Sequence, residues 1–165
     1  MPALENAPAT ATDNILLTQT RIIRAPRAKV YDAWTNPEIM EQWFGSPMMY
    51  CSSASLDVRV GGSYRIEAIR KEATTVSAQD ICDGRPFNAV TGEYTKVIPN
   101  ALLQFTWIAA WAPEEKSLVT VSLKDAPGGT ELTVLHERFA SETSRDAHNN
   151  GWCHALENIA RVVAG

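Results

Sequence analysis

The two side chains of this sequence that are best suited to catalysis or ligand binding are those of two histidines. His136 ends the apolar face of an alternating segment, and His148 lies one helical turn before a tryptophan. A neutral histidine at the end of an apolar face can act as a general base. It can equally be a buried residue that one hydrogen bond satisfies. If the elements that carry them pack together, the two rings meet, and His136 is then the candidate catalytic residue.

The sequence predicts neither a metal site nor a reactive nucleophile. Two histidines are too few ligands for zinc. Cys153 follows His148 by five residues, which places it about 140° away around a helix. Cys153 and His154 are adjacent, so their side chains do not face each other. We therefore expect no metal and no cofactor, and we interpret all three cysteines, Cys51, Cys82 and Cys153, as reduced thiols.

Three charged residues are further candidates for binding or catalysis. Asp57 and Arg59 stand two apart in an expected strand, so both side chains point to one face. They can anchor an anionic ligand, or they can form a surface ion pair worth about 0–1 kcal/mol. Glu93 can be a general acid if its strand turns it inward, and it is only a solvated charge if turned outward. We expect surface roles for all three.

A long amphipathic helix over residues 141–165 is the strongest structural pattern. Its apolar residues recur at spacings of 4, 3 and 4, at Trp152, Leu156, Ile159 and Val163. Ser141, or a loose capping box that begins at Thr143, can start the helix. A helix with so wide an apolar face must be buried, and the large surface available is a sheet. We expect Gly151 to mark a close approach to another backbone.

The rest of the sequence predicts strands and two short helices. Pro26 and Pro37 favour helix starts, which predicts helices over 27–35 and 37–44. Alternation and turn signals predict strands over 15–23, 54–60, 63–69, 89–98, 101–109, 117–124 and 130–137, with a further short strand around 74–81. The short turns force antiparallel pairing. The predicted fold class is α+β: one strand, two short helices, a run of about six antiparallel strands and one long helix.

Length and composition restrict the class of protein. The 165 residues fit one domain over 14–165, after a tail over 1–13 that we expect to be disordered. No apolar run is long enough to span a membrane. The net charge of −4 and the scattered Lys and Arg argue against nucleic acid as a partner. With no secretory signal and no paired cysteines, we expect a cytoplasmic protein.

Eight short stretches resemble a known family. They are 23–26 (IRAP), 30–38 (VYDAWTNPE), 43–44 (WF), 57–64 (DVRVGGSY), 92–94 (GEY), 103–107 (LQFTW), 129–136 (GTELTVLH) and 148–152 (HNNGW). In this order and spacing the chain resembles the helix-grip proteins of the START-like or SRPBCC superfamily. Within them it is most similar to the C-terminal domain of the activator of heat-shock protein 90 ATPase. The resemblance covers nearly all of residues 15–163, and it is specific for the fold rather than for an activity.

The resemblance implies a curved antiparallel sheet wrapped round the C-terminal helix, with a cavity between them for a small apolar or aromatic ligand. Relatives include polyketide cyclases and lipid carriers. One alternative is therefore a cyclase-like enzyme that uses His136, and another is a chaperone-accessory or stress-response interaction module. The co-chaperone carries an additional N-terminal domain that this sequence does not contain, so we expect a chaperone partner less than a ligand. A homodimer is compatible with the family.

We expect large inward-facing side chains to line that cavity. The sequence holds five tryptophans, and each large ring buries about 150–250 Å². The alternative is that the rings fill the interior and leave no space. Polar groups such as Tyr64, His136 and His148 would orient the ligand. The candidate ligand-binding residues are Met48, Tyr64, Ile66, Phe105, Trp107, His136, Phe139, His148, Trp152 and Leu156.

Overall fold

A computed structural model describes residues 14–46, 49–70 and 88–164 of the chain. Four predictions concern residues outside this set: the disordered tail over 1–13, the short strand around 74–81, the ligand-binding role of Met48 and the thiol of Cys82.

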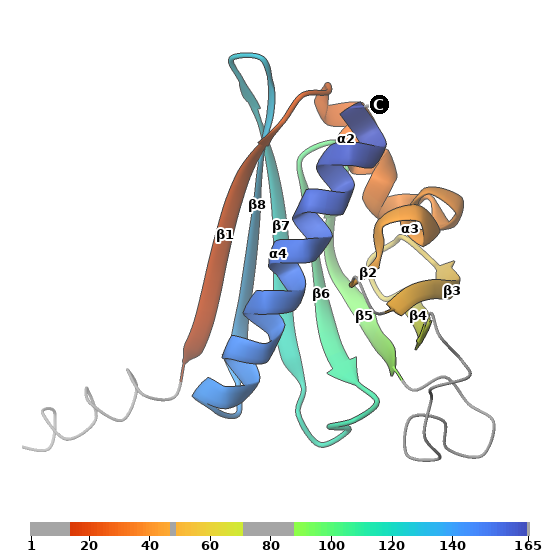
Figure 1. Cartoon of the computed structure of the whole chain (residues 1–165), viewed down its shortest axis with the longest axis vertical. Coiled ribbons are helices and arrows are strands. Elements are labelled where there is room, and N and C mark those ends of the chain that lie inside the picture. The colour runs from red at the N-terminus through yellow and green to blue at the C-terminus, as the bar shows by residue number, and fades with distance from the viewer. Residues whose placement is uncertain (1–13, 47–48, 71–87, 165) are drawn as a thin grey trace, which may run out of the picture.

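The described residues form one antiparallel sheet, two short helices after the first strand and a long final helix (Figure 1). In chain order the elements are β1 (Ile15–Ile23), α2 (Arg27–Thr35), α3 (Pro37–Trp43), β2 (Gly45–Ser46), β3 (Met49–Leu56), β4 (Ser63–Arg70), β5 (Asn88–Ile98), β6 (Leu102–Ala109), β7 (Ser117–Ala126), β8 (Gly129–Phe139) and α4 (Glu142–Ala164). The strands lie in the order β1-β8-β7-β6-β5-β4-β3-β2. The predicted α+β fold is confirmed, and β2 adds a strand of two residues that alternation cannot reveal.

Prolines and one asparagine define the two short helices, as the sequence predicts. Asn36 ends α2 and caps α3, because its side-chain oxygen accepts a hydrogen bond of 2.9 Å from the Glu38 backbone N–H. Pro37 then occupies the first turn of α3. The indole N–H of Trp43 donates to the Ala33 carbonyl at 2.7 Å, which fixes α3 against α2.

The strand predicted over 54–60 is wrong in its bounds. β3 ends at Leu56, and the chain then turns through residues 57–62 with short backbone hydrogen bonds. Gly61 has a φ of 87°, and a Cβ on Gly62 would lie 2.0 Å from the Asp57 carbonyl oxygen. Both glycines therefore belong to a turn that starts earlier than the sequence suggested. Val60, the last residue of the expected strand, is 64% exposed.

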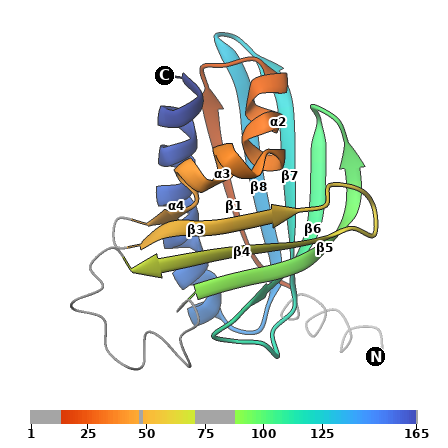
Figure 2. The same ribbon diagram turned by 90° about the vertical axis from the view of Figure 1, so that its right-hand side faces the viewer.

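The sheet curls around α4, so that one half of it runs along the helix and the other half crosses it. Figure 2 shows β3, β4 and β5 lying across the long axis of α4, while β1, β7 and β8 follow that axis. A register shift between Tyr94 and Lys96 interrupts the pairing of β5 with β6 where the direction changes. Gly92 permits the tight approach there, since a Cβ would lie 1.9 Å from the Thr106 carbonyl oxygen.

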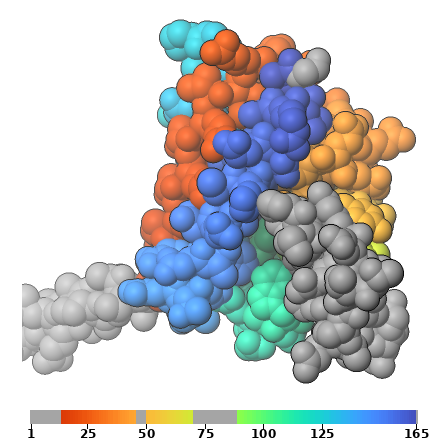
Figure 3. All heavy atoms as spheres, in the orientation of Figure 1, coloured from red at the N-terminus to blue at the C-terminus, as the bar shows by residue number. Residues whose placement is uncertain are grey.

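α4 closes the concave face of the sheet with its apolar side. Ser141 caps the helix, because its hydroxyl accepts from the Ser144 backbone N–H at 3.1 Å, and the Thr143 box is not used. The prediction that Trp152 points inward is confirmed: its side chain is 4% exposed. The opposite side of α4 forms a ridge on the surface of the molecule (Figure 3). The buried residues of α4 are His148, Trp152, Ala155, Leu156, Ile159 and Val163.

Candidate functional site

His136 is completely buried in β8 and takes part in a continuous chain of hydrogen bonds. The indole N–H of Trp152 donates to His136 Nδ1 at 3.0 Å. His136 Nε2 lies 2.7 Å from Ser117 Oγ, and that hydroxyl donates to the Trp107 carbonyl at 3.2 Å. Because the indole can only donate, Nδ1 must be the acceptor and Nε2 must carry the hydrogen. The chain therefore links β6, β7 and β8 to α4 through one neutral imidazole.

Burial keeps the His136 ring uncharged. Desolvation, with a smaller contribution from nearby His148, lowers the pKa of His136 from 6.5 to about 2. Both ring nitrogens are already occupied by protein partners. The ring would therefore have to break a buried hydrogen bond before it could accept a proton from a substrate.

A bulge at the end of β8 places Phe139 beside His136. Strand alternation alone would turn Arg138 inward after His136. Arg138 instead adopts a φ of 70°, its side chain is exposed, and Phe139 is buried. The ring centroid of Phe139 lies 4.2 Å from that of His136 and 5.0 Å from that of His148. The bulge thus supplies an aromatic wall between the strand and α4.

His148 meets His136 across the interface of strand and helix, as the sequence predicts. The two ring centroids are 5.1 Å apart, with the planes nearly perpendicular at 78°. His148 Nδ1 lies 2.8 Å from the Ser144 carbonyl oxygen, which can only accept. Nδ1 is therefore the nitrogen that carries the hydrogen in this contact. The Trp107 and Trp111 rings flank His148 with centroids at 6.1 and 5.8 Å.

A cavity of about 180 Å³ lies between α4 and the strands that cross it. Rings form much of its wall, and small residues form the rest. Gly151 and Trp111 are both exposed, so the cavity reaches the surface beside α4. Its described lining consists of Phe44, Gly45, Ala68, Val90, Trp107, Trp111, Ala147, His148, Gly151, Trp152 and Ala155.

The expectation that Gly151 marks a close backbone approach is wrong. A Cβ built on Gly151 would meet nothing within 4 Å, whereas the same test at Gly92 gives a severe clash. Gly151 instead lines the cavity on the exposed edge of α4. The missing side chain therefore leaves space beside the helix.

The predicted ligand-binding residues divide into three groups. Trp107, His148 and Trp152 line the cavity. Three others line a neighbouring void of only about 10 Å³, which aromatic rings almost fill: Tyr64, Ile66 and Phe105. The remaining described candidates are buried but belong to neither lining: His136, Phe139 and Leu156.

Most of the small residues that line the cavity were not predicted from the sequence as ligand-binding residues. Ala68 and Val90 alternate correctly in β4 and β5, so alternation could have placed them inside, but only the curl of the sheet brings them to α4. Phe44 follows α3 directly and adjoins Trp43 in the sequence, but its contact with Trp107 exists only in the tertiary structure. Trp111 lies in the loop between β6 and β7, where the sequence has neither strand nor helix periodicity that could have predicted its position.

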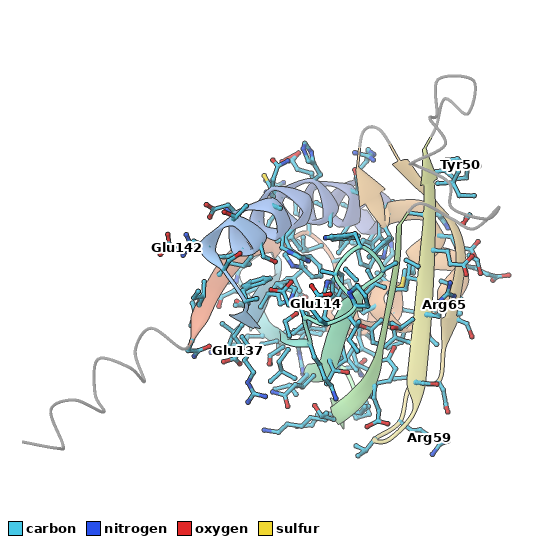
Figure 4. The ribbon with its side chains drawn as sticks, turned by 90° about the horizontal axis from the view of Figure 1, so that it is seen from below. Tyr50, Arg59, Arg65, Glu114, Glu137 and Glu142 are labelled. Carbon is cyan, nitrogen blue, oxygen red and sulfur yellow. The ribbon has the colours of Figure 1, made fainter. Side chains whose placement is uncertain are left out.

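The charged candidates lie away from the cavity. Arg59 and Asp57 form an exposed ion pair of 3.0 Å in the turn between β3 and β4. Figure 4 shows Arg59 at the tip of that turn, far from α4. Glu93 is exposed and borders a shallow groove with Arg65 and Lys116 on the opposite face of the sheet. Among the lining residues that the structure describes, none is an aspartate, glutamate, lysine or arginine.

The described residues contain neither a cluster of metal ligands nor a helix that could span a membrane. Nowhere in residues 14–46, 49–70 and 88–164 do three or more His, Cys, Asp or Glu side chains gather in a way that could hold a metal ion. None of the helices in the described part of the chain is both long enough and apolar enough to cross a membrane.

Comparison with known proteins supports the fold assignment. The model of the family "Activator of Hsp90 ATPase homolog 1-like protein" matches residues 24–164. The crystal structure of protein CV1439 from Chromobacterium violaceum has a TM-score of 0.77 at 22% identity, covering 91% of this chain and 98% of that chain. The solution structure of an AHSA1-like protein from Aeromonas hydrophila has a TM-score of 0.69 at 21% identity, covering 91% and 92%.

These identities establish a shared fold and no more. No curated protein matches the sequence. The resemblance to helix-grip proteins is confirmed by the family match and by these neighbours. The chain belongs to the Activator of Hsp90 ATPase homolog 1-like family.

Proposed function

We propose that this protein binds a small, uncharged, largely apolar or aromatic molecule in the cavity between α4 and the crossing strands. The observation that carries the proposal is the cavity itself: about 180 Å³, walled by rings and small apolar residues, and reaching the surface at Gly151 and Trp111. Concave apolar sites with a few polar groups are the usual form of small-molecule sites.

The size and lining of the cavity define what it can hold. An apolar cavity of about 150 Å³ is large enough for benzene, so this one accommodates a substituted single ring. Burial of the ligand's apolar surface supplies about 25 cal/mol per Å², against which the loss of freedom on binding must be set. A charged ligand is disfavoured, because the described lining contains no opposite charge to offset its desolvation.

The two alternative functions have weaker support in the geometry. An enzyme using His136 would need a free ring nitrogen beside the cavity, but both nitrogens are bonded and His136 does not belong to the lining. An interaction module would expose an apolar patch. The exposed large apolar side chains of the described residues are instead spread over several elements: Leu16, Ile22, Tyr50, Val60, Ile98 and Trp111.

A binding experiment with a matched pair of variants tests the proposal. We expect p-xylene to raise the melting temperature of the protein and to give a saturable heat of binding. Gly151→Leu places a branched side chain in the open space beside α4 and should weaken p-xylene binding at least tenfold. Gly151→Ala adds only one methyl group and should bind nearly as the parent does.

Each outcome of this experiment either supports or refutes the cavity as the binding site. Binding that Gly151→Leu abolishes and Gly151→Ala preserves supports the cavity as the site. Binding that is indifferent to Gly151→Leu would move the site elsewhere. Failure of the parent protein to bind p-xylene or any other single-ring probe would refute the proposed function.

A further inference from the structure

The loop between β6 and β7, residues 110–116, contributes one wall of the cavity through a single side chain. Trp111 lines the cavity, yet it is 51% exposed. Its ring centroid lies 5.8 Å from that of the buried His148 ring in α4, with the planes tilted by 31°. Half of Trp111 stays in water, so burial fixes this ring less firmly than it fixes a core ring. The position of Trp111 therefore depends on how the loop is attached to α4.

Glu115, near the other end of the same loop, supplies such an attachment. Its carboxylate accepts from the Ala140 backbone N–H at 2.5 Å and from the Ser144 hydroxyl at 2.8 Å. Both donors lie at or just before the first turn of α4, where the free backbone N–H groups favour a negative charge. Hydrogen bonds to a carboxylate are also stronger than those between neutral groups. One loop side chain thus makes two charge-assisted hydrogen bonds to the start of the helix.

The loop is folded so that Glu115 and Trp111 move together. Two consecutive turns connect them, because the Ala112 backbone N–H donates to the Ala109 carbonyl and the Glu115 N–H donates to the Ala112 carbonyl, both at 3.0 Å. Pro113 lies between the two residues and has a fixed φ. A displacement of Glu115 is therefore transmitted to the ring of Trp111 over four residues.

Ser144 joins both partners of the ring contact to one residue of α4. Its hydroxyl donates to Glu115, while its carbonyl oxygen lies 2.8 Å from His148 Nδ1. The same turn of helix therefore orients His148 from below and the Trp111 loop from the side. This arrangement brings the two rings together at the edge of the cavity where it reaches the surface.

We propose that Glu115 is a positioning residue for the ligand site: it holds Trp111 against His148, and the ring held in this way completes the wall beside the cavity opening. This inference rests on the proposed function of the cavity. Loss of the carboxylate releases the loop from α4, and Trp111 then no longer makes a steady contact with a bound ring. Glu115 itself does not belong to the described lining, so its effect on binding passes through Trp111.

The first measurement needs no ligand. The chain contains only three histidines, so the ring-proton NMR signal of His148 is identified as the one that His148→Asn removes. Trp111→Ala should move this signal at a fixed pH, because the indole ring beside His148 is lost. Glu115→Ala should move it in the same direction, although it leaves both rings in the protein. Glu115→Gln keeps one acceptor oxygen and should move the signal less than Glu115→Ala does.

The second measurement is the dissociation constant for p-xylene. Glu115→Ala and Trp111→Ala should each weaken binding about fivefold, the effect of losing one ring from the apolar contact. The double variant should bind no more weakly than Trp111→Ala alone, because Glu115 acts through that ring.

Ser141→Ala is the matched control. It also removes a hydrogen bond at the start of α4, the cap that Ser141 makes to the Ser144 backbone N–H, but it leaves the contacts of Glu115 in place. It should lower the melting temperature while the His148 signal and the dissociation constant for p-xylene stay as in the parent protein. A role of Glu115 that is limited to stabilising α4 would make the two variants behave alike.

The outcomes separate this inference from the proposed function. If p-xylene binds the parent protein and Glu115→Ala changes neither the His148 signal nor the affinity, the cavity is a site but Glu115 does not position its wall, and the inference is wrong. It is also wrong if Ser141→Ala reproduces the effects of Glu115→Ala, or if Glu115→Ala weakens binding further in the absence of Trp111. If p-xylene does not bind the parent protein, the role in binding fails with the proposed function, and the His148 signal still decides whether Glu115 holds Trp111.

Discussion

His136 shows how one buried polar residue can organise the contact between sheet and helix. Its ring accepts from Trp152 in α4, and its Nε2–H points to Ser117 in β7. Both of its nitrogens are satisfied, so the ring adds directionality to an otherwise apolar interface. His148, in contrast, keeps one nitrogen unpartnered among the described residues and lines the cavity. The two histidines are close neighbours with different roles.

The neutral state of His136 makes stability dependent on pH. The pKa of His136 is lowered to about 2 in the folded protein by burial, with His148 as the titratable group that faces it. The unfolded chain titrates near 6.5, so below that pH it binds a proton that the folded protein does not. The free energy of unfolding should fall by about 2 kcal/mol from this residue between pH 7 and pH 5.

Urea unfolding at the two pH values measures this effect. His136→Gln is expected to be less stable at pH 7, and its stability should change less between pH 7 and pH 5, by about the same 2 kcal/mol. Equal pH dependence in the two proteins would show that His136 binds a proton to the same extent in the folded and unfolded states, which contradicts the lowered pKa.

Gly151 provides a second test at a single residue. Its position in α4 is exposed, and a Cβ would meet nothing within 4 Å. Gly151→Ala should therefore stabilise the protein by up to about 1 kcal/mol, the difference in helix propensity. For a domain of this size the melting temperature should rise by about 2–4 °C. A lower melting temperature would mean that the glycine serves a contact or a conformation absent from this structure.

At the scale of elements, β5 and its crossing of β6 decide the shape of the sheet. Gly92 brings the two strands together, and Tyr64 from β4 donates to the Thr106 carbonyl at 2.6 Å beside it. This crossing turns β3, β4 and β5 across α4 (Figure 2). The cavity lies under that turn, because Ala68 of β4 and Val90 of β5 form part of its wall.

Gly92→Ala should therefore destabilise the protein. The new methyl group would lie 1.9 Å from the Thr106 carbonyl oxygen and 2.7 Å from the Tyr64 ring, and backbone atoms cannot easily give way. We expect a loss of about 1–3 kcal/mol in the free energy of unfolding, measured with urea. Gly151→Ala makes the same chemical change with the opposite expected sign. If Gly92→Ala leaves the free energy of unfolding unchanged, β5 and β6 can move apart at no cost in stability.

Local signals in the sequence predicted much of the element order. Proline, asparagine and the helical period define α2, α3 and α4 through contacts within a few residues of each helix end. The bounds of β3 were wrong because apolar residues at Val58 and Val60 imitate strand alternation inside a turn. Phe139 is buried as expected, but the cause, a positive φ at Arg138, could not be predicted because arginine has no preference for that conformation.

The location of the cavity could be predicted less well than the fold. Facing inward is a property of one strand, but lining a cavity depends on how two distant elements are spaced. Tyr64 and Phe105 face inward as expected, and their rings pack edge to face at 5.4 Å, which fills that part of the interior. The free space lies where Gly45, Ala68 and Gly151 come together, and only the tertiary structure brings these residues together.

At the scale of the whole molecule, the curled sheet and α4 enclose an interior with two parts. One part is filled by side chains, which we call the packed half, and the other contains the cavity, which we call the hollow half. The packed half holds the rings of Trp34, Trp43 and Tyr94 around a void of about 10 Å³. The hollow half holds about 180 Å³ beside α4. Since a packed interior is the ordinary state of proteins, the hollow half is the part of this fold that requires a functional explanation.

A crystal structure of the protein soaked with p-xylene tests the central claim most directly. We predict density for one ring between Trp107, Trp152 and Gly151, in contact with the small residues of β4 and β5 and with α4 in its present position. A structure in which the protein's own side chains fill that space, or in which p-xylene binds only at another surface, would contradict the account.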